Sequence, residues 1–338
     1  RILIKLKPKK IIILDLSEYN LYKIKQEFEK KFSALSNIKY ILGNTTDEKV
    51  INEIIQTYKV NIILHSAAYK HVPIVEENPI SGMSNNVLSA ISICNSARLN
   101  NIEKVILIST DKAVRPSNIM GASKRISELV FLNMHKLSKI KVNKFDTKFS
   151  IVRFGNVMGS SGSVIPLFEK QIKNGGPITI THPNIIRYFM TIKEACTLVL
   201  QATALCDGGE IYLLDMGKPI KIYDLARKMI KLSGNTIKDN ANPKGDIEIR
   251  YLGLREGEKL YEELLINGKK KPTKNNLIFI SEEDNNEPME HYISKINELE
   301  VNLKNRELNK SILLMKNIIP EWVISKNYRY INSLVKKK

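Results

Sequence analysis

Cysteine is scarce in this sequence, with three residues, Cys94, Cys196 and Cys206, in a chain of 338. They are odd in number and lack the spacing of metal ligands, so we expect no disulfide framework and a reducing, cytoplasmic compartment. Long hydrophobic runs are also missing. The apolar runs at 11–14 and 62–64 have the length of a strand, well below the roughly 18 residues that cross a membrane. The sequence shows no signal-peptide pattern and no internal repeat.

Acidic residues are few beside basic ones: 35 Asp and Glu stand against 53 Lys and Arg, which gives a formal net charge of +18. Such an excess of positive charge can bind nucleic acid, an anionic membrane or a phosphorylated substrate. The lysines are spread along the chain, and no basic stripe interleaved with aromatic residues occurs. We therefore expect a solvated basic surface and no nucleic-acid partner. With 43% hydrophobic and 26% charged residues, the chain can bury a core.

Short β-branched runs alternate with longer amphipathic stretches in the first half of the chain. Near-continuous apolar strands separated by helices predict a parallel sheet covered on both faces, which is a doubly wound α/β fold. The expected strands are 11–15, 38–43, 62–66, 105–109 and 149–154, and the expected helices are 17–32, 47–58, 79–99 and 122–137.

The composition changes near residue 155, where glycine and proline become frequent. We expect a smaller α/β region laid over one end of the sheet, then a loop and a mostly helical C-terminal part with a frayed tail. The chain therefore divides into 1–155, 156–280 with some return to the sheet, and 281–338. In the last two parts the expected helices are 193–205, 222–232, 258–265 and 289–334, the strands are 178–181, 211–215 and 247–252, the loop is 282–288 and the tail is 336–338.

Open parallel sheets bind ligands at the carboxyl ends of their strands, so the residues after each strand are the first candidates for chemistry. Asp15 and Ser17 follow the first strand. An acid at this place in a doubly wound fold binds the adenosine ribose, although the segment is equally a helix N-cap region. The glycine-rich turn of a dinucleotide site should come about 20 residues earlier. It is absent, and nothing between Arg1 and Pro8 can cradle a pyrophosphate.

The third strand leads into a segment of small side chains, Ser66, Ala67 and Ala68. Small residues at a strand end let a flat cofactor approach the backbone. The neighbouring His65 and His71 lack a carboxylate or cysteine partner, so we expect no metal.

The fourth strand leads into Asp111 and Lys112, which offer an acid and a base at one point in space. Met120 and Lys124 follow four residues apart and would share one face of a helix. The alternative is a surface turn followed by a helix with an exposed lysine, and spacing alone does not decide between them.

Long ordered motifs around these strand ends resemble one family. The segments are HSAAYKHVPIVEENP, NNVLSAISICNSARLNNIEKVILISTDKAVRPSNIMGASKR, VRFGNVMGSSGSVIPLF, RYFMTIKEAC, LLDMGKPIKIYDLARKMIKLSG and LGLREGEKLYEELL. Together they resemble the UDP-N-acetylglucosamine 4,6-dehydratases, CapD-like extended short-chain dehydrogenases of polysaccharide biosynthesis. The resemblance covers about residues 8 to 270. It implies a Rossmann-type fold, NAD or NADP in the sheet crevice and a UDP-sugar between the two regions.

The mechanism that the resemblance implies is internally redox-neutral. The cofactor takes hydride from sugar carbon 4, and the resulting ketone acidifies the proton on carbon 5. A base removes that proton while an acid protonates the leaving 6-hydroxyl, and the hydride returns to carbon 6. Lys112 resembles the family's base and Asp111 its acid, so Lys112 must be neutral and Asp111 protonated in the reacting complex. Thr110 and Ser109 would bond the sugar or cofactor near carbon 4.

Lys124 matches a lysine of the wider superfamily, and four residues before that lysine the superfamily has tyrosine. This chain has Met120 at that position instead. In that superfamily a phenolate deprotonates the hydroxyl being oxidised, and the lysine holds the nicotinamide ribose. A thioether has no proton to exchange and is a weak acceptor, so the base for the 4-hydroxyl stays open. One subgroup of these dehydratases, often membrane-anchored, also carries methionine here, and we expect slow but real turnover.

The remaining resemblances concern binding. Asn44 stands where related sequences have an aspartate that contacts adenine, and Lys70 lies near the nicotinamide or the substrate phosphates. Arg187 and Arg255 resemble residues that neutralise a diphosphate, with a surface ion pair as the alternative for each. The cofactor set is Asp15, Ser17, Asn44, Thr45, Ser66, Ala67, Ala68, Lys70, Ser109 and Lys124. The substrate set is Lys70, Asn156, Val157, Ser160, Ser163, Val164, Arg187 and Arg255.

Two other interpretations of the function stay open. A UDP-sugar 4-epimerase shares the fold, the cofactor and the first hydride transfer, although it needs no acid–base pair for elimination. A chain truncated before its glycine turn would be a catalytically silent fragment that no longer retains NAD(P). The resemblance also favours a homo-oligomer and leaves room for a membrane anchor upstream of Arg1 in a longer parent protein.

Overall fold

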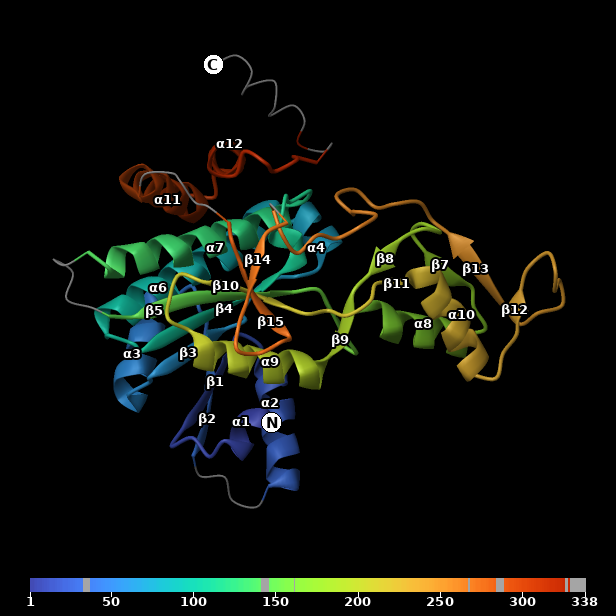
Figure 1. Cartoon of the computed structure of the whole chain (residues 1–338), viewed down its shortest axis with the longest axis horizontal. Coiled ribbons are helices and arrows are strands. Elements are labelled where there is room, and N and C mark those ends of the chain that lie inside the picture. The colour runs from blue at the N-terminus through green and yellow to red at the C-terminus, as the bar shows by residue number, and fades with distance from the viewer. Residues whose placement is uncertain are drawn as a thin grey trace, which may run out of the picture.

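A six-stranded sheet forms the centre of the computed structural model, which describes residues 1–32, 37–140, 146–160, 162–266, 268–283, 289–325 and 328 (Figure 1). The strand order is β14-β15-β10-β5-β4-β3. The last four strands in that order are parallel, and β15 and β14 are added antiparallel at one edge. The strands are β3 (Ile62–His65), β4 (Lys104–Thr110), β5 (Lys148–Phe154), β10 (Ile211–Leu214), β14 (Lys270–Pro272) and β15 (Ile278–Ser281).

Helices cover both faces of this sheet because both faces of its strands are apolar. Val105 and Leu107 of β4 join the hydrophobic cluster under α6 and α7, whereas Ile106 joins the cluster under α9. This alternation is that of a strand buried on both sides, and it confirms the doubly wound prediction. The covering helices are α3 (Glu48–Tyr58), α6 (Ser89–Leu99), α7 (Ile119–Ser138) and α9 (Ile192–Leu205). Among the helices that the structure describes, none has both the length and the apolar character to cross a bilayer.

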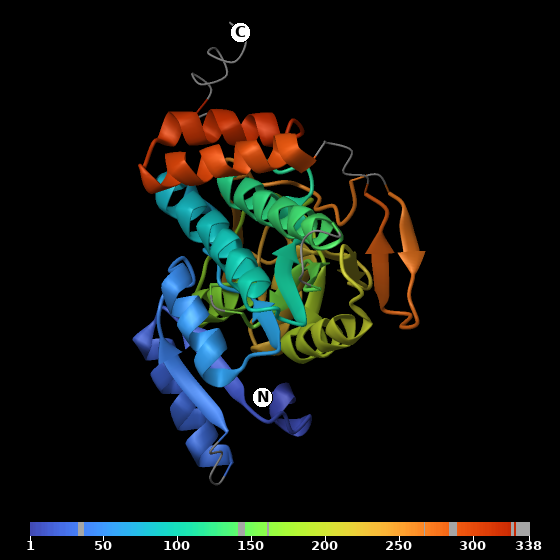
Figure 2. The same cartoon turned by 90° about the vertical axis from the view of Figure 1, so that its left-hand side faces the viewer.

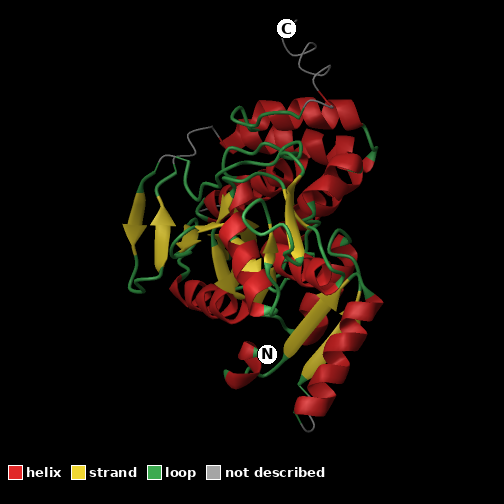
Figure 3. Ribbon diagram, turned by 90° about the vertical axis from the view of Figure 1, so that its right-hand side faces the viewer, coloured by secondary structure: helices red, strands yellow, loops and turns green. Residues whose placement is uncertain are grey.

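Two strands stand apart from the central sheet. β1 (Ile11–Asp15) and β2 (Ile38–Leu42) pair in parallel with each other and, in the described residues, with no other strand. Figures 2 and 3 show this pair at one end of the molecule. Every residue of β1 is half-buried, where a central parallel strand is normally buried on both faces. The helices of this part are α1 (Ile2–Lys5) and α2 (Glu18–Lys31).

A smaller α/β region extends from one end of the sheet, on the right of Figure 1. Its helices α8 and α10 pack against a sheet of β7, β13 and β12 around the buried side chains of Phe168, Ile178 and Ile230. Two short ribbons, β6–β9 and β8–β11, accompany it. The elements are β6 (Asn156–Met158), α8 (Val164–Lys173), β7 (Ile178–Ile180), β8 (Ile186–Arg187), β9 (Phe189–Thr191), β11 (Ile220–Lys221), α10 (Ile222–Leu232), β12 (Ile237–Lys238) and β13 (Ile247–Tyr251).

Two C-terminal helices, α11 (Met289–Lys304) and α12 (Leu308–Ile318), lie across α7 (Figure 2). Leu299, Met315 and Trp322 are buried in the same hydrophobic cluster as the side chains of α6 and α7. The backbone N–H of Val323 donates to the carbonyl of Pro116, shortly before α7 begins. The C-terminal part is therefore continuous with the core.

Two expected helices are interrupted. The stretch 79–99 divides into α5 (Pro79–Met83), the π-helical turn η1 (Ser84–Leu88) and α6, after a short α4 (Val72–Glu77). The stretch 289–334 divides into α11 and α12, and the chain is irregular from Ile319 to Ser325. Most of its remainder, the tail 336–338 and most of the expected loop 282–288 lie outside the described residues.

The helix expected at 258–265 is wrong, because this segment has no regular structure. Its leucines contact three separate hydrophobic clusters. Leu260 packs against the smaller region, Leu264 against the cluster under α9, and Leu265 against the cluster under α6 and α7. A single helical face cannot reach three clusters, so the segment crosses the molecule in an irregular path instead.

Candidate active site

The predicted acid–base pair lies at the carboxyl end of β4, where the strand continues into the short 3-10 helix η2 (Asp111–Ala113). Lys112 Nζ donates to Asp111 Oδ1 at 2.9 Å, and Thr110 Oγ1 donates to the same oxygen at 2.8 Å. Asp111 is 1% exposed and the Lys112 side chain is 23% exposed. The structure therefore places an acid and a base in direct contact at this strand end.

Two further side chains approach Lys112. Asn156, at the start of β6, accepts a 3.3 Å hydrogen bond from Lys112 Nζ with its Oδ1. Glu262, which is absent from the predicted set, has its Oε1 3.9 Å from Nζ and a side chain that is 5% exposed. Burial lowers the pKa of Lys112, but the charges of Asp111 and Glu262 outweigh burial, so this pKa is raised. Lys112 is therefore an ammonium in this arrangement.

Arg187 of β8 lies on the other side of Glu262. Its Nη2 is 3.7 Å from Glu262 Oε1 and 3.5 Å from Glu258 Oε1. The guanidinium also donates to three main-chain carbonyls, two of them within 258–262. Arg187 thus holds this segment against the acid–base pair, and its diphosphate role stays a prediction. Arg255 is exposed, and its backbone N–H donates to Glu258.

Helix α7 carries Met120 and Lys124 on its buried side. Lys124 is 6% exposed, which excludes the alternative of an exposed lysine, and its Nζ donates to the carbonyl of Ile108 on β4 at 2.7 Å. Burial lowers the pKa of Lys124 to about 8, with Glu128 acting in the opposite direction. Met120 is 3% exposed and offers no exchangeable proton.

The close approach of α7 to the acid–base turn depends on Gly121. A Cβ at this position would lie 2.3 Å from the carbonyl oxygen of Lys112, far inside van der Waals contact. The helix carrying Met120 and Lys124 therefore touches the backbone of η2 directly.

Replacing Gly121 by alanine should lower the free energy of unfolding by about 1–3 kcal/mol, because α7 must move away from η2. Urea unfolding measures the change. Gly43→Ala is the matched control, since its Cβ would meet only methyl groups of Leu14 and Val50, at 3.1 and 3.2 Å. Equal stabilities of the two variants would show that the contact at Gly121 is not tight.

A buried ion-pair network lies behind the site. Arg153 of β5 is 0% exposed, donates to both carboxylate oxygens of Glu128 and pairs with Glu283. Ser109 Oγ donates to Glu128 at 2.6 Å, so this hydroxyl is engaged inside the core. Burial alone would raise the pKa of Glu128, but Arg153 and Arg125 bring it down to about 2. The network joins β4, β5 and α7 behind the residues that form the site.

The sequence contains a signal for this network that the predicted site did not use. Arg153 stands inside an apolar strand, and a buried charge requires a partner of opposite charge. Glu128 lies one helical turn after Lys124 and is that partner. For Glu262 the sequence offers no comparable signal, because its neighbours are a mixture of leucines and charged residues.

The predicted adenosine contacts lie at the ends of β1 and β2. Asp15 Oδ1 accepts the N–H of Ser17 at 2.8 Å, and Asn44 Oδ1 accepts the N–H of Thr46 at 2.9 Å. Thr45 lies half-buried in the second turn. Both polar side chains therefore shape the turns that lead into α2 and α3.

The predicted nicotinamide contacts lie after β3. Ser66 and Lys70 are exposed there, and Ala67 and Ala68 are half-buried; partial burial lowers the pKa of Lys70. Asn86 fixes this loop: its Oδ1 accepts the N–H of Tyr69 at 2.7 Å, and its Nδ2 donates to Ser123 Oγ at 2.9 Å. The loop is thus tied to α7 beside Lys124.

The predicted substrate segment after β6 forms a turn into α8. The N–H of Ser163 donates to the carbonyl of Ser160 at 3.0 Å. Ser163 Oγ is buried and has no hydrogen-bond partner among the residues described. Val157 pairs with Met190 in the β6–β9 ribbon, and Val164 packs against the core of the smaller region.

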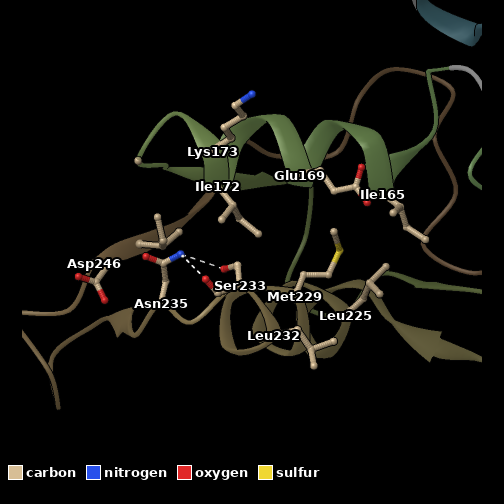
Figure 4. Close-up of a pocket in the computed structure, with 12 residues that line it drawn as sticks. Ile165, Glu169, Ile172, Lys173, Leu225, Met229, Leu232, Ser233, Asn235 and Asp246 are labelled. Atoms are coloured by element: carbon tan, nitrogen blue, oxygen red, sulfur yellow. Dashed lines mark hydrogen bonds between the residues drawn. The ribbon is translucent and has the colours of Figure 1, made fainter.

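A cavity of about 880 Å³ lies between α8 and α10 in the smaller region (Figure 4). Apolar side chains of the two helices, such as Ile172 and Met229, face it, and the Asn235 amide donates to Ser233 at its edge. No residue of the predicted site lines this cavity. It is therefore separate from the acid–base pair.

These features define a protein with the extended short-chain dehydrogenase fold, with an acid–base pair at the carboxyl end of a central strand. The chain belongs to the family described as "Polysaccharide biosynthesis protein", which matches residues 1–283. The predicted membership of a CapD-like group is thereby confirmed.

Individual relatives agree with this membership. The chain is 47% identical over 261 residues to the capsular polysaccharide biosynthesis protein CapD of Staphylococcus aureus, covering 77% of this chain and 41% of CapD. It is 34% identical over 257 residues to UDP-glucose 4-epimerase of Rickettsia rickettsii, covering 75% and 70%. The structure of Pen from Bacillus thuringiensis has a TM-score of 0.72 and 32% identity, covering 82% of this chain and 81% of Pen. The chain thus spans less than half the length of CapD.

Proposed function

We propose that the chain is a nucleotide-sugar 4,6-dehydratase that converts UDP-N-acetylglucosamine to a UDP-4-keto-6-deoxy-N-acetylhexosamine. The contact between Asp111 and Lys112 at the carboxyl end of β4 carries the proposal. Elimination of water from a sugar needs a base for the carbon-5 proton and an acid for the 6-hydroxyl, and this pair offers both. Similarity to CapD, a capsular polysaccharide biosynthesis protein, supports a role in surface polysaccharide synthesis.

The site residues fit the nicotinamide half of NAD or NADP. The small side chains of Ala67 and Ala68 leave room for a flat ring in the loop after β3, which Asn86 ties to α7. Among the described residues, Lys124 Nζ uses one of its three N–H donors on the carbonyl of Ile108, so two donors are left for a ligand. Asp15 offers a carboxylate at the place expected for the adenosine ribose. The first glycine of the chain is Gly43, so the described residues provide no glycine turn for the pyrophosphate. When bound, the nicotinamide supplies the acceptance and return of a hydride.

Asp111 and Lys112 account for the protons of the elimination. Lys112 takes the carbon-5 proton, and Asp111 gives its proton to the departing hydroxyl, which leaves as water. This exchange produces an ammonium and a carboxylate side by side, which the 2.9 Å contact between Lys112 Nζ and Asp111 Oδ1 supports. Lys112 then gives a proton back to carbon 5 of the product, and the proton released by the 4-hydroxyl of the sugar replaces the one that Asp111 lost with water. The net change is the loss of one water molecule.

Incubation with UDP-N-acetylglucosamine in heavy water tests the proposal. The expected product is lighter by one water and carries deuterium at carbon 5, read by mass spectrometry and NMR. The same assay on a version extended at the N-terminus separates a wrong activity from a chain that cannot hold its cofactor. Absence of water loss in both versions overturns the proposal.

A UDP-sugar 4-epimerase is the second candidate, because the chain is 34% identical to UDP-glucose 4-epimerase of Rickettsia rickettsii. An epimerase inverts carbon 4 and leaves the mass of the sugar unchanged. The acid beside Lys112 favours dehydration, since inversion needs no leaving-group acid. The mass of the product therefore decides between the two candidates.

Replacing Met120 by tyrosine should leave turnover unchanged or raise it. A phenol adds an exchangeable proton on the same helix face as Lys124. The pKa of Lys124 is lowered to about 8, close to neutral pH, so its amine can exchange a proton with the phenol. Turnover of UDP-N-acetylglucosamine measures the effect, and Met120→Phe is the control that adds the ring without the hydroxyl. Loss of all activity in Met120→Tyr alone would show that the site is built around methionine.

A further inference from the structure

Glu262 is a buried carboxylate between two cations. Its Oε1 lies 3.9 Å from Lys112 Nζ and 3.7 Å from Arg187 Nη2. The side chains of Glu262 and Arg187 are 5% and 8% exposed, so water screens these charges little. The carboxylate therefore acts on Lys112 over a short distance that water screens little.

The second oxygen of Glu262 is not used. Oε2 is buried and has no hydrogen-bond partner among the described residues. A buried, unpaired carboxylate oxygen costs free energy, and the irregular segment that carries it is held in place by Arg187. Packing alone does not require a carboxylate here, because an amide or an apolar side chain would fill the same volume at lower cost.

We propose that Glu262 is a third member of the acid–base site, a positioning residue whose negative charge holds Lys112 in its ammonium form. The charged groups that face Glu262 are Lys112, Asp111 and Arg187, with Lys259 on its own segment. Burial and the neighbouring Asp111 raise the pKa of Glu262, against Lys112 and Arg187, so Glu262 gains a proton more readily than an exposed glutamate. Protonation of Glu262 weakens the hold on the Lys112 proton.

The consequence for catalysis rests on the proposed dehydratase function. Lys112 removes the carbon-5 proton only as a neutral amine, so exchange at carbon 5 rises with pH as Lys112 loses its proton. A negative charge at Glu262 stabilises the ammonium and places this rise at higher pH. Removing the charge should therefore move the rise to lower pH.

The Lys112 amine can be titrated directly by NMR of protein labelled with carbon-13 at lysine Cε, with Lys112→Ala to assign its signal. This measurement needs neither cofactor nor substrate. The midpoint should fall in Glu262→Gln and take an intermediate value in Glu262→Asp, which keeps the charge but withdraws it from Nζ.

Glu258→Gln is the matched control, because Glu258 pairs with the same arginine at 3.5 Å and has no contact with Lys112 in the structure. An unchanged midpoint in Glu262→Gln, or an equal fall in Glu258→Gln, overturns the inference. The aspartate variant carries the same test if the glutamine variant does not fold.

The pH profile of carbon-5 exchange gives the second readout. At pH values below the rise, Glu262→Gln should exchange about tenfold faster than the unaltered chain, the lower end of what an opposite charge at this distance produces. A purely structural role would lower exchange at every pH without moving the rise. Midpoints that move as expected, without any exchange in either the unaltered chain or its N-terminally extended version, would contradict the dehydratase proposal and leave the role of Glu262 standing.

Discussion

Replacing Lys112 by alanine should abolish exchange of the carbon-5 proton with solvent and lower turnover by about 10²- to 10⁴-fold, the range for loss of a general base. Lys112 Nζ is held between Asp111 at 2.9 Å and Asn156 at 3.3 Å, so the amine has a fixed position at the carboxyl end of β4. No other amine is bonded to Asp111 in the described residues. Deuterium incorporation from heavy water measures the loss.

Asp111→Asn is the control that separates the base from the acid. It keeps the amine of Lys112 and removes the proton donor for the 6-hydroxyl. Exchange at carbon 5 should persist in Asp111→Asn while water loss falls. Retained exchange in Lys112→Ala would assign the base to another group.

Replacing Arg153 by alanine should lower the free energy of unfolding by about 3–5 kcal/mol, because breaking a buried pair leaves an uncompensated charge in the core. Both Arg153 and Glu128 are 0% exposed, and Arg153 also pairs with Glu283. The change leaves two carboxylates without their main cation. Urea denaturation followed by circular dichroism measures the loss.

Arg250→Ala is the matched control for Arg153. It also breaks an arginine–glutamate pair, with Glu248 at 2.9 Å, but these side chains are 58% and 43% exposed. An exposed pair contributes less than about 1 kcal/mol, so this variant should be nearly as stable as the unaltered chain. Similar losses in the two variants would mean that the network behind the site is as weak as a surface ion pair.

Individual strands could be predicted from the sequence because they are short apolar runs bounded by helix caps, but the separation of β1 and β2 from the central sheet could not. Strand β1 was predicted with its observed bounds, and helix α2 begins after its predicted cap, Ser17, whose Oγ accepts the N–H of Asn20. The prediction failed at 258–265, where apolar spacing suggested one helical face. There the leucines contact three clusters, and such long-range partners leave no local pattern.

The acid–base pair was predictable because Asp111 and Lys112 are adjacent and directly follow a strand. The spacing of Met120 and Lys124 placed both on one helix face but left an exposed lysine as an alternative, which only the 6% exposure of Lys124 in the structure excludes. Glu262 could not be found this way, because it lies 150 positions after Lys112 in the chain and only the fold brings the two charged groups to 3.9 Å. Arg187 shows the same limit: its residue type suggests phosphate binding, and the structure shows that its donors hold main-chain carbonyls.

The position of α11 and α12 bears on how this protein can be handled in the laboratory. The family match ends at residue 283, yet Leu299, Met315 and Trp322 beyond it are buried in the same hydrophobic cluster as side chains of α6 and α7. A chain shortened to the family boundary would expose that apolar surface to water, and such patches drive aggregation. The part of the chain that covers this apolar surface therefore extends beyond the part that the family matches, and we expect a chain ending at residue 283 to aggregate more readily.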